Sequence, residues 1–297
     1  MRIQGGSPSN LAGIGFMVFG TFCFVLNDSL MKLAMGELPP FQVLAFRGMF
    51  GTVFLVPMLA WTGQLRHLAS SLNRYVIARG LLEVGAIVCF AVSLANAPIA
   101  DITAIFQTTP LLIILGMAFV HREPVDGFRL SLVAAGFAGA LMVAQPGGPE
   151  TSPFAMLAFF TAFFAAARDL VGRHIPGETP VLVSTMVTVL LVLIASVLIG
   201  LSFEDWSLLA GGHIASLSAA GLLMAFGHVF TFLAYRRAEA QAVAPFYYAF
   251  MLWALILGYL MFSEVPNTLA LAGMALIFAS GIAIVWRERR AVAEPLA

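Results

Sequence analysis

Ten apolar runs, each of about twenty residues, dominate this sequence. A helix needs about 20 apolar residues to cross a bilayer, and these runs lack the polar face that a water-exposed helix requires. Only 10% of the 297 residues are charged, against about 25% in an average soluble domain. Cutting at Gly/Pro-rich or charged breaks, we predict an all-α membrane protein with ten transmembrane helices at residues 11–35, 41–62, 74–96, 99–120, 127–145, 153–174, 181–200, 214–236, 242–263 and 267–286.

The first run has an alternative interpretation as a cleaved signal peptide, because residues 11–26 are apolar enough for its central region. The run continues through Asn27 and Asp28 to Lys32, however, and the second half of the chain contains a copy of it. We therefore interpret it as the first helix of the fold.

The basic residues predict the orientation in the membrane, because cytoplasmic loops of membrane proteins carry an excess of Lys and Arg. With a cytoplasmic N-terminus, eleven of the fifteen basic residues fall on the cytoplasmic side and only Lys32 on the opposite side. The other three, Arg47, Arg79 and Arg168, lie within helices. We expect a multi-pass protein of the cell inner (plasma) membrane, surrounded by the lipid bilayer, with both termini in the cytoplasm.

The sequence matches itself at a constant offset of 141 residues. At this offset rare residues coincide without a gap, and such matches are improbable by chance in a mainly apolar chain. We predict two five-helix repeats, residues 1–148 and 149–297, and five helices each would make the second repeat inverted, as in many secondary transporters. The coincident pairs include Asp28 with Asp169, Lys32 with Arg173, Gly36 with Gly177, Glu37 with Glu178, Pro39 with Pro180, and Glu123 with Glu264.

The order and spacing of these features resemble the drug/metabolite transporter superfamily, in particular its EamA-type branch. The resemblance covers essentially the whole chain: five helices plus five, the breaks Glu123-Pro124 and Glu264-Val265-Pro266, and glycines in helices 5 and 10. The stretch 243–253 is similar to a branch with predicted riboflavin and S-adenosylmethionine uptake proteins, which also contains metabolite exporters. The resemblance implies a central cavity lined mainly by helices 1, 3, 4, 6, 8 and 9.

Two ionisable residues lie near the middle of predicted helices, Glu83 in helix 3 and His228 in helix 8. Ionisable groups at membrane depth are costly and usually face a cavity or a partner. We interpret both as candidate groups for substrate binding or proton coupling. The alternatives are a structural ion pair of Glu83 with Arg79 or Arg47, and a packing role for His228.

The duplicated acid–base pairs, Asp28 with Lys32 and Asp169 with Arg173, have the acid four residues before the base, which is the favourable order on a helix. Inverted repeats would place one pair on each side of the membrane. They are candidate gate latches. The alternative is neutralisation at helix ends, with the basic side chains reaching for the membrane surface.

A proline interrupts corresponding helices of the two halves, Pro110 in helix 4 and Pro245 in helix 9. Proline cannot donate a backbone hydrogen bond, so we predict a kink at each place. Breaks at equivalent positions of two repeats indicate a binding site. Gln107, Tyr247 and Tyr248 are therefore candidate substrate contacts suited to a planar or heterocyclic solute, although tyrosines also form belts at the membrane surface.

These observations predict a secondary transporter of a small organic metabolite, with protons as a candidate coupling ion. Uptake of a heterocyclic, cofactor-like solute such as riboflavin or S-adenosylmethionine is favoured; export of amino acids or related metabolites is the alternative. A membrane-embedded enzyme is more distant, because we find no catalytic cluster or Walker A loop. We expect no cofactor, no metal and, at zero formal net charge, no nucleic acid partner. A monomer can form a complete pathway, and a homodimer remains an alternative.

Overall fold

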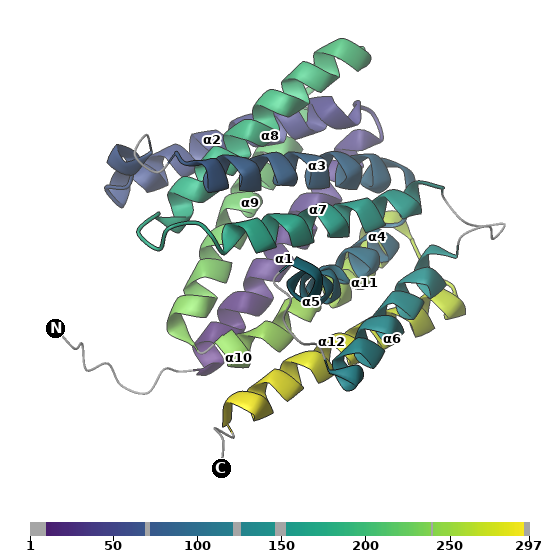
Figure 1. Cartoon of the computed structure of the whole chain (residues 1–297). Helices are drawn as coiled ribbons and strands as arrows, with labels where there is room; N and C mark the ends of the chain where they lie inside the picture. The colour runs from purple at the N-terminus through teal and green to yellow at the C-terminus, as the bar shows by residue number, and fades with distance from the viewer. Residues whose placement is uncertain (1–9, 69–71, 121–125, 146–152, 239, 294–297) are drawn as a thin grey trace.

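The computed structural model describes residues 10–68, 72–120, 126–145, 153–238 and 240–293, and all regular structure in these residues is helical (Figure 1). The elements follow the chain in this order: α1 (Asn10–Met35), α2 (Pro40–Trp61), the 3₁₀ turn η1 (Leu65–His67), α3 (Arg74–Asn96), α4 (Ile99–Phe106), α5 (Thr109–Val120), α6 (Gly127–Ala144), η2 (Pro153–Met156), α7 (Leu157–Gly172), α8 (Val181–Phe203), α9 (Gly211–Arg237), α10 (Ala240–Val243), η3 (Ala244–Tyr248), α11 (Ala249–Phe262) and α12 (Thr268–Ala293).

The predicted all-helical membrane fold is confirmed. Within the described residues, nine helical segments are long and apolar enough to cross a membrane. The remaining predicted span coincides with η2 and α7, which follow each other directly over residues 153–172. The largest difference in a boundary is at α12, which continues to Ala293 rather than ending at residue 286.

Both predicted proline breaks are present. The fourth span divides into α4 and α5 just before Pro110, and the ninth divides into α10, η3 and α11 around Pro245. Pro110 leaves the carbonyl of Phe106 without its usual helical donor. The hydroxyl of Thr109 donates to that carbonyl at 2.6 Å, so the break is satisfied locally by a side chain.

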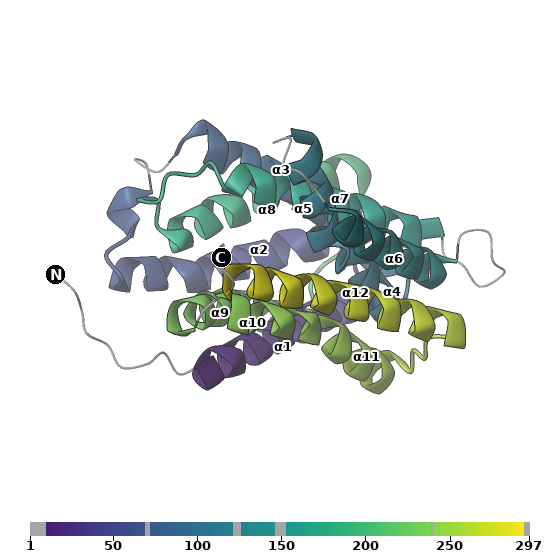
Figure 2. The ribbon, with the colours of Figure 1, turned by 60° about the horizontal axis from the view of Figure 1, so that its bottom comes forward.

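Most helix contacts join one half of the chain to the other. α1 packs against α9 and α3 against α7, while α2 packs against α8 and α6 against α12. In the second half of the chain, α7, α8, α9 and α12 are the first, second, third and fifth spans. The first span of each half thus packs against the third span of the other half, the two second spans pack on each other, and so do the two fifth spans. The start of α1 and the end of α12 lie toward the same end of the bundle in both views (Figures 1 and 2).

Glycines allow the closest of these approaches. A side-chain carbon added at Gly139 of α6 would lie 2.7 Å from the carbonyl oxygen of Gly273 in α12, and one added at Gly273 would clash with Gly139 in return. Figure 2 shows these two helices side by side along their length. The pair lies outside the cavity described below and holds the last spans of the two halves together.

Candidate functional site

A cavity of about 310 Å³ lies among the helices, and ionisable side chains gather around it. It is lined by α1, α3, α4, α7, α9 and the η3–α11 segment, which are the helices implied by the resemblance, and also by α2 and α8. Its polar and aromatic lining comprises Phe24, Asn27, Asp28, Arg47, Arg79, Glu83, Phe90, Thr103, Phe106, Thr161, Arg168, Thr185, Thr188, His228, Thr231, Tyr247 and Phe250.

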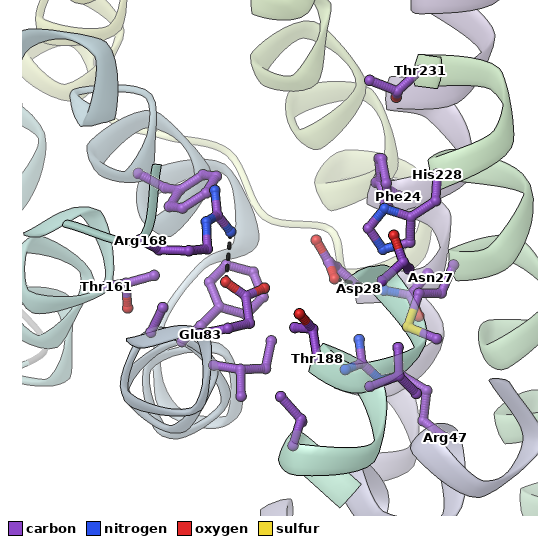
Figure 3. Close-up of a pocket in the computed structure, with 18 of the residues that line it drawn as sticks. Phe24, Asn27, Asp28, Arg47, Glu83, Thr161, Arg168, Thr188, His228 and Thr231 are labelled. Atoms are coloured by element: carbon purple, nitrogen blue, oxygen red, sulfur yellow. Dashed lines mark hydrogen bonds and ion pairs between the residues drawn. The ribbon is translucent and has the colours of Figure 1, made fainter. Parts of the chain in front are cut away.

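Arg168 of α7 holds two carboxylates, and Figure 3 shows its ion pair with one of them, Glu83, at one side of the cavity. Its Nη1 lies 2.5 Å from Oε2 of Glu83 on α3, and its Nε lies 2.8 Å from Oδ1 of Asp169. Glu83 therefore does form an ion pair, but with Arg168 rather than with Arg79 or Arg47, the partners proposed from sequence spacing. The acid and the base come from different halves of the chain.

The same local contact occurs at the equivalent place in the first half. Nδ2 of Asn27 donates to Oδ1 of Asp28 at 2.8 Å, just as Nε of Arg168 donates to Asp169. Asn27 and Arg168 coincide at the repeat offset, and both line the cavity. In each half a donor thus orients the acid that follows it, but only the second half uses a charged donor.

Two further guanidinium groups line the cavity, on Arg47 of α2 and Arg79 of α3. Nη1 of Arg79 donates to the hydroxyl of Thr188 on α8 at 3.0 Å. Nε of Arg47 is buried and has no hydrogen-bond partner in the described part of the chain. From the sequence these two residues were expected only as alternative ion-pair partners of Glu83. Their position within membrane spans, outside the loops, was the signal that they could face a cavity.

The candidate residues His228 and Tyr247 also line the cavity. The ring of His228 meets that of Phe24 edge to face at 5.0 Å, and Tyr247 packs against Phe250 at 5.2 Å between ring centroids. Together with Glu83 and Asp28, these residues make up the part of the sequence-predicted site that the structure brings together.

Gln107 and Tyr248 are located differently. Both are buried, and neither is among the residues that line the cavity. The side-chain amide of Gln107 donates to the backbone carbonyl of Tyr247 at 3.4 Å, which connects α4 to η3. Tyr248 packs edge to face against Phe278 of α12. In this conformation they support the two helix breaks rather than the wall of the cavity.

The gate candidates also have other partners than the sequence spacing suggested. Lys32 contacts Glu264, not Asp28, with 2.5 Å between Nζ and Oε1. Nζ of Lys32 also donates to the carbonyl of Ala97 at 2.6 Å, and Oε2 of Glu264 accepts from the amide of Ile99 at 2.9 Å. This cluster, here called the Lys32–Glu264 latch, joins the end of α1, the start of α4 and the α11–α12 connection.

At the equivalent place in the second half, Arg173 makes a different contact. Its Nη1 lies 3.1 Å from the sulfur of Met117 on α5, and the side chain is exposed. Glu123, the counterpart of Glu264 at the repeat offset, lies outside the described residues.

Comparison with known proteins identifies the family. The model of the EamA-like transporter family matches the chain twice, over residues 11–145 and 153–286. A solved structure titled only as the crystal structure of a protein has a TM-score of 0.67 and 19% identity, and the match covers 93% of this chain and 98% of that one. That likeness shows the fold.

Several named relatives match along nearly their full length. A riboflavin transporter of Rhizobium johnstonii is 30% identical, covering 96% of this chain and 92% of the relative. An S-adenosylmethionine uptake transporter of Rickettsia felis is 24% identical with 96% of each covered. The pseudopaline exporter CntI of Pseudomonas aeruginosa is 27% identical, covering 92% of this chain and 95% of the relative.

The family and the names of the relatives indicate a transporter rather than an enzyme. They agree with the resemblance to the drug/metabolite transporter superfamily and with the membrane-spanning helices. The chain is therefore a multi-pass membrane transporter and belongs to the EamA-like transporter family.

Proposed function

We propose that this transporter moves a small organic solute across the inner membrane by alternating access of the central cavity. The observation that carries the proposal is the position of the cavity. It lies between the two halves of the chain, with ionisable groups of both halves in its wall and the Lys32–Glu264 latch beyond one end. Ionisable groups at membrane depth mark transport pathways.

The proposed architecture is an inverted repeat of two five-helix halves. It is supported by the family model, which matches each half separately. It is also supported by the helix contacts, in which each half packs against the other in the same way, and by the equivalent contacts of Asn27 and Arg168. In such folds the solute binds near the midplane, between the repeats. Rocking of one half against the other would then expose the cavity to each side in turn.

The excess of basic residues in one set of loops supports cytoplasmic termini. With this orientation the Lys32–Glu264 latch closes the outer side. The inner half then contains Arg79, which is the sixth residue of α3, and Arg168, which is near the end of α7. The conformation described here then corresponds to an inward-facing state, in which Arg173 is free of an acidic partner among the described residues.

We favour uptake of a heterocyclic, cofactor-like solute. Two of the compared relatives are named for riboflavin and for S-adenosylmethionine uptake. A cavity of about 310 Å³ is at the lower end of the range for drug-sized ligands, about 300–1,000 Å³. Phe24, Phe90, Phe106 and Phe250 in the wall provide aromatic surface for a planar ring.

The test is solute flux into proteoliposomes that contain the purified full-length chain. Riboflavin and S-adenosylmethionine are supplied as labelled solutes, with empty liposomes as the control. Uptake of either solute that saturates with concentration supports the proposal. Absence of flux for these solutes and for a panel of amino acids and nucleosides, from protein that remains folded, contradicts it.

Proton coupling is tested in the same liposomes. If protons drive the flux, a protonophore abolishes accumulation against a gradient while exchange of labelled for unlabelled solute continues. The variants Glu83→Gln and His228→Gln should then alter the pH profile of flux. Unchanged rates and affinities across pH in both variants would remove these residues from the mechanism.

Export of amino acids or related metabolites is the second candidate, favoured by the relative named as a pseudopaline exporter. The direction of an alternating-access cycle follows the gradients across the membrane, and in liposomes these gradients are set by the experimenter. The direction of transport is therefore tested in whole cells. Accumulation of solute in cells that express the chain supports uptake, and faster loss from preloaded cells supports export. Light scattering after size-exclusion chromatography distinguishes a monomer from a homodimer.

A further inference from the structure

Among the described residues, the ionisable side chains around the cavity form ion pairs on one side but not on the other. At one side, Arg168 holds both Glu83 and Asp169. At the other side lie Asn27, Asp28 and Arg47, as Figure 3 shows. Arg47 has no carboxylate within 4.0 Å in the part of the chain that the structure describes. The first side is a completed ion pair network, whereas the second contains a base and an acid that do not touch.

Arg47 is unusual because it is buried and still lacks partners. Its exposed fraction is 6%, and its Nε has no hydrogen-bond acceptor among the described residues. A buried donor without a partner is costly, more so when it carries charge. Native structures contain few such groups, and a functional role is one of the explanations for each.

Asn27 is in a similar state on the same wall. It is 2% exposed, and its Oδ1 is a buried acceptor without a donor, although its Nδ2 is used to orient Asp28. Thr231 contributes a third such atom, its hydroxyl oxygen. Three of the buried unpartnered side-chain atoms in the described residues therefore line this one cavity.

The donors and acceptors on this wall determine which chemical groups a solute needs in order to bind there. A guanidinium binds a carboxylate through two parallel hydrogen bonds. An amide oxygen beside a carboxylate accepts hydrogen bonds from an ammonium group. The wall thus presents a site for a negative group at Arg47 next to a site for a positive group at Asn27 and Asp28.

We propose that Arg47, Asn27 and Asp28 form a subsite for a zwitterionic head group, a carboxylate with an ammonium group beside it, on the transported solute. The carboxylate binds Arg47, and the ammonium binds Oδ1 of Asn27 and the carboxylate of Asp28. This inference rests on the proposed function, since it assigns the substrate class of the same cavity. It favours solutes such as S-adenosylmethionine, which carries an α-amino-acid group, over riboflavin, which carries neither charge.

The test compares solutes that differ only in the carboxylate. Purified full-length protein in nanodiscs is titrated with S-adenosylmethionine and with its decarboxylated form, and with a panel of amino acids and the corresponding amines. Riboflavin serves as the uncharged probe. For the wild type we expect at least one acid to bind roughly tenfold or more tightly than its decarboxylated partner, as for a charged hydrogen bond.

Substitutions then show which residues cause the preference for the acid over its decarboxylated partner. Arg47→Gln should reduce the ratio of affinities to about one, and Arg47→Lys should retain part of it, because lysine keeps the charge without the bidentate geometry. Asp28→Asn should weaken binding of the amino acid but not of the same acid without its amino group. Arg74→Gln is the control: this exposed arginine starts α3, and its Nη2 donates to the hydroxyl of Tyr75, outside the cavity lining.

Several outcomes would overturn the subsite. They are equal binding of acid and amine by the wild type, a ratio that Arg47→Gln leaves unchanged, and no binding by any zwitterion in the panel. Binding or transport of riboflavin alone would overturn the subsite while supporting the proposed transport function. The absence of flux for every solute contradicts the proposed function itself. If Arg47→Gln does not fold, Arg47→Lys and Asp28→Asn still decide the question.

Discussion

Lys32 and Glu264 lie 232 positions apart in the chain, yet their side chains meet at 2.5 Å between Nζ and Oε1. The contact joins the first span to the connection before the last one, and the side chains are only 14% and 18% exposed. Because Lys32 also donates to the carbonyl of Ala97, and Glu264 accepts from the amide of Ile99, three connections between helices meet at this pair.

The first prediction follows from the proposal that the Lys32–Glu264 latch closes its side of the protein: Glu264→Gln should open that side. Loss of a charged hydrogen bond of about 1.5–3 kcal/mol shifts a two-state equilibrium roughly tenfold or more. Spin labels at Leu208 and Val265, which are 97% and 71% exposed, placed in a variant without Cys23 and Cys89, should show a larger population of long distances.

The control for the latch is Glu37→Gln. Glu37 pairs with His213 at 2.9 Å, but its side chain is 76% exposed, so little change is expected. Lys32→Gln should resemble Glu264→Gln, and the double variant should be no more open than either, since the partners act as a unit. Additive shifts, or none, would show that the pair does not hold this side closed.

The second prediction concerns Arg168. Arg168→Gln should destabilise the protein more than Glu83→Gln. Removal of the arginine leaves both Glu83 and Asp169 without their counter-charge, whereas removal of Glu83 leaves Arg168 bound to Asp169. Breaking a buried ion pair in this way costs about 3–5 kcal/mol.

Thermal unfolding followed by size-exclusion chromatography measures this difference. Combining Arg168→Gln with Glu83→Gln should recover part of the lost stability, because one uncompensated acid is removed. Equal melting temperatures for the two single variants would contradict the assignment of Arg168 as the shared partner.

The partner of Glu83 illustrates what the sequence predicted and what it did not. Each helix range follows from local hydropathy, and the breaks at Pro110 and Pro245 follow from the missing backbone donor, so both were predictable. The pairing of Glu83 with Arg168 depends instead on how α3 and α7 pack. Spacing within α3 offered Arg79, and Arg47 of α2 was the other alternative, but neither signal reports which helices pack across the bundle.

The sequence also did not predict which face of each helix is turned toward the cavity. The fourth and ninth spans, residues 99–120 and 242–263, are largely apolar, and their few polar residues do not mark a single face, so periodicity gives no orientation for Gln107 or Tyr248. Both turn toward neighbouring helices, whereas Tyr247, next in the chain to Tyr248, lines the cavity. Amphipathic helices of soluble proteins carry this information in their polar face, and membrane helices do not.

The third prediction tests the break between α4 and α5. Thr109→Val should destabilise the protein by about 1–3 kcal/mol, because the Phe106 carbonyl loses the hydroxyl donor that replaces the missing amide of Pro110. Thr109→Ser keeps the hydroxyl and should be close to the wild type. Adding Pro110→Ala to Thr109→Val restores a backbone donor and should recover stability in the same unfolding measurement. Failure to recover would show that the carbonyl is satisfied in another way.

The fourth prediction concerns the approach of α6 to α12. Gly139→Ala places a methyl carbon 2.7 Å from the carbonyl oxygen of Gly273, so the helices must separate. We expect a loss of about 1–3 kcal/mol, as for overpacked cores. Gly15→Ala is the matched control, because an added carbon at Gly15 meets nothing within 4 Å. Similar melting temperatures for both variants would contradict a tight contact.

The Lys32–Glu264 latch also has a consequence for biogenesis. Membrane proteins are synthesised from the N-terminus, at about 5–20 residues per second. Lys32 therefore enters the membrane long before the ribosome has made its acidic partner 232 residues later, an interval of roughly 10–50 s at that rate. Ala97, whose carbonyl also accepts from this ammonium group in the folded chain, is made much sooner. The Lys32–Glu264 contact can thus form only near the end of translation, after residue 264 has been made.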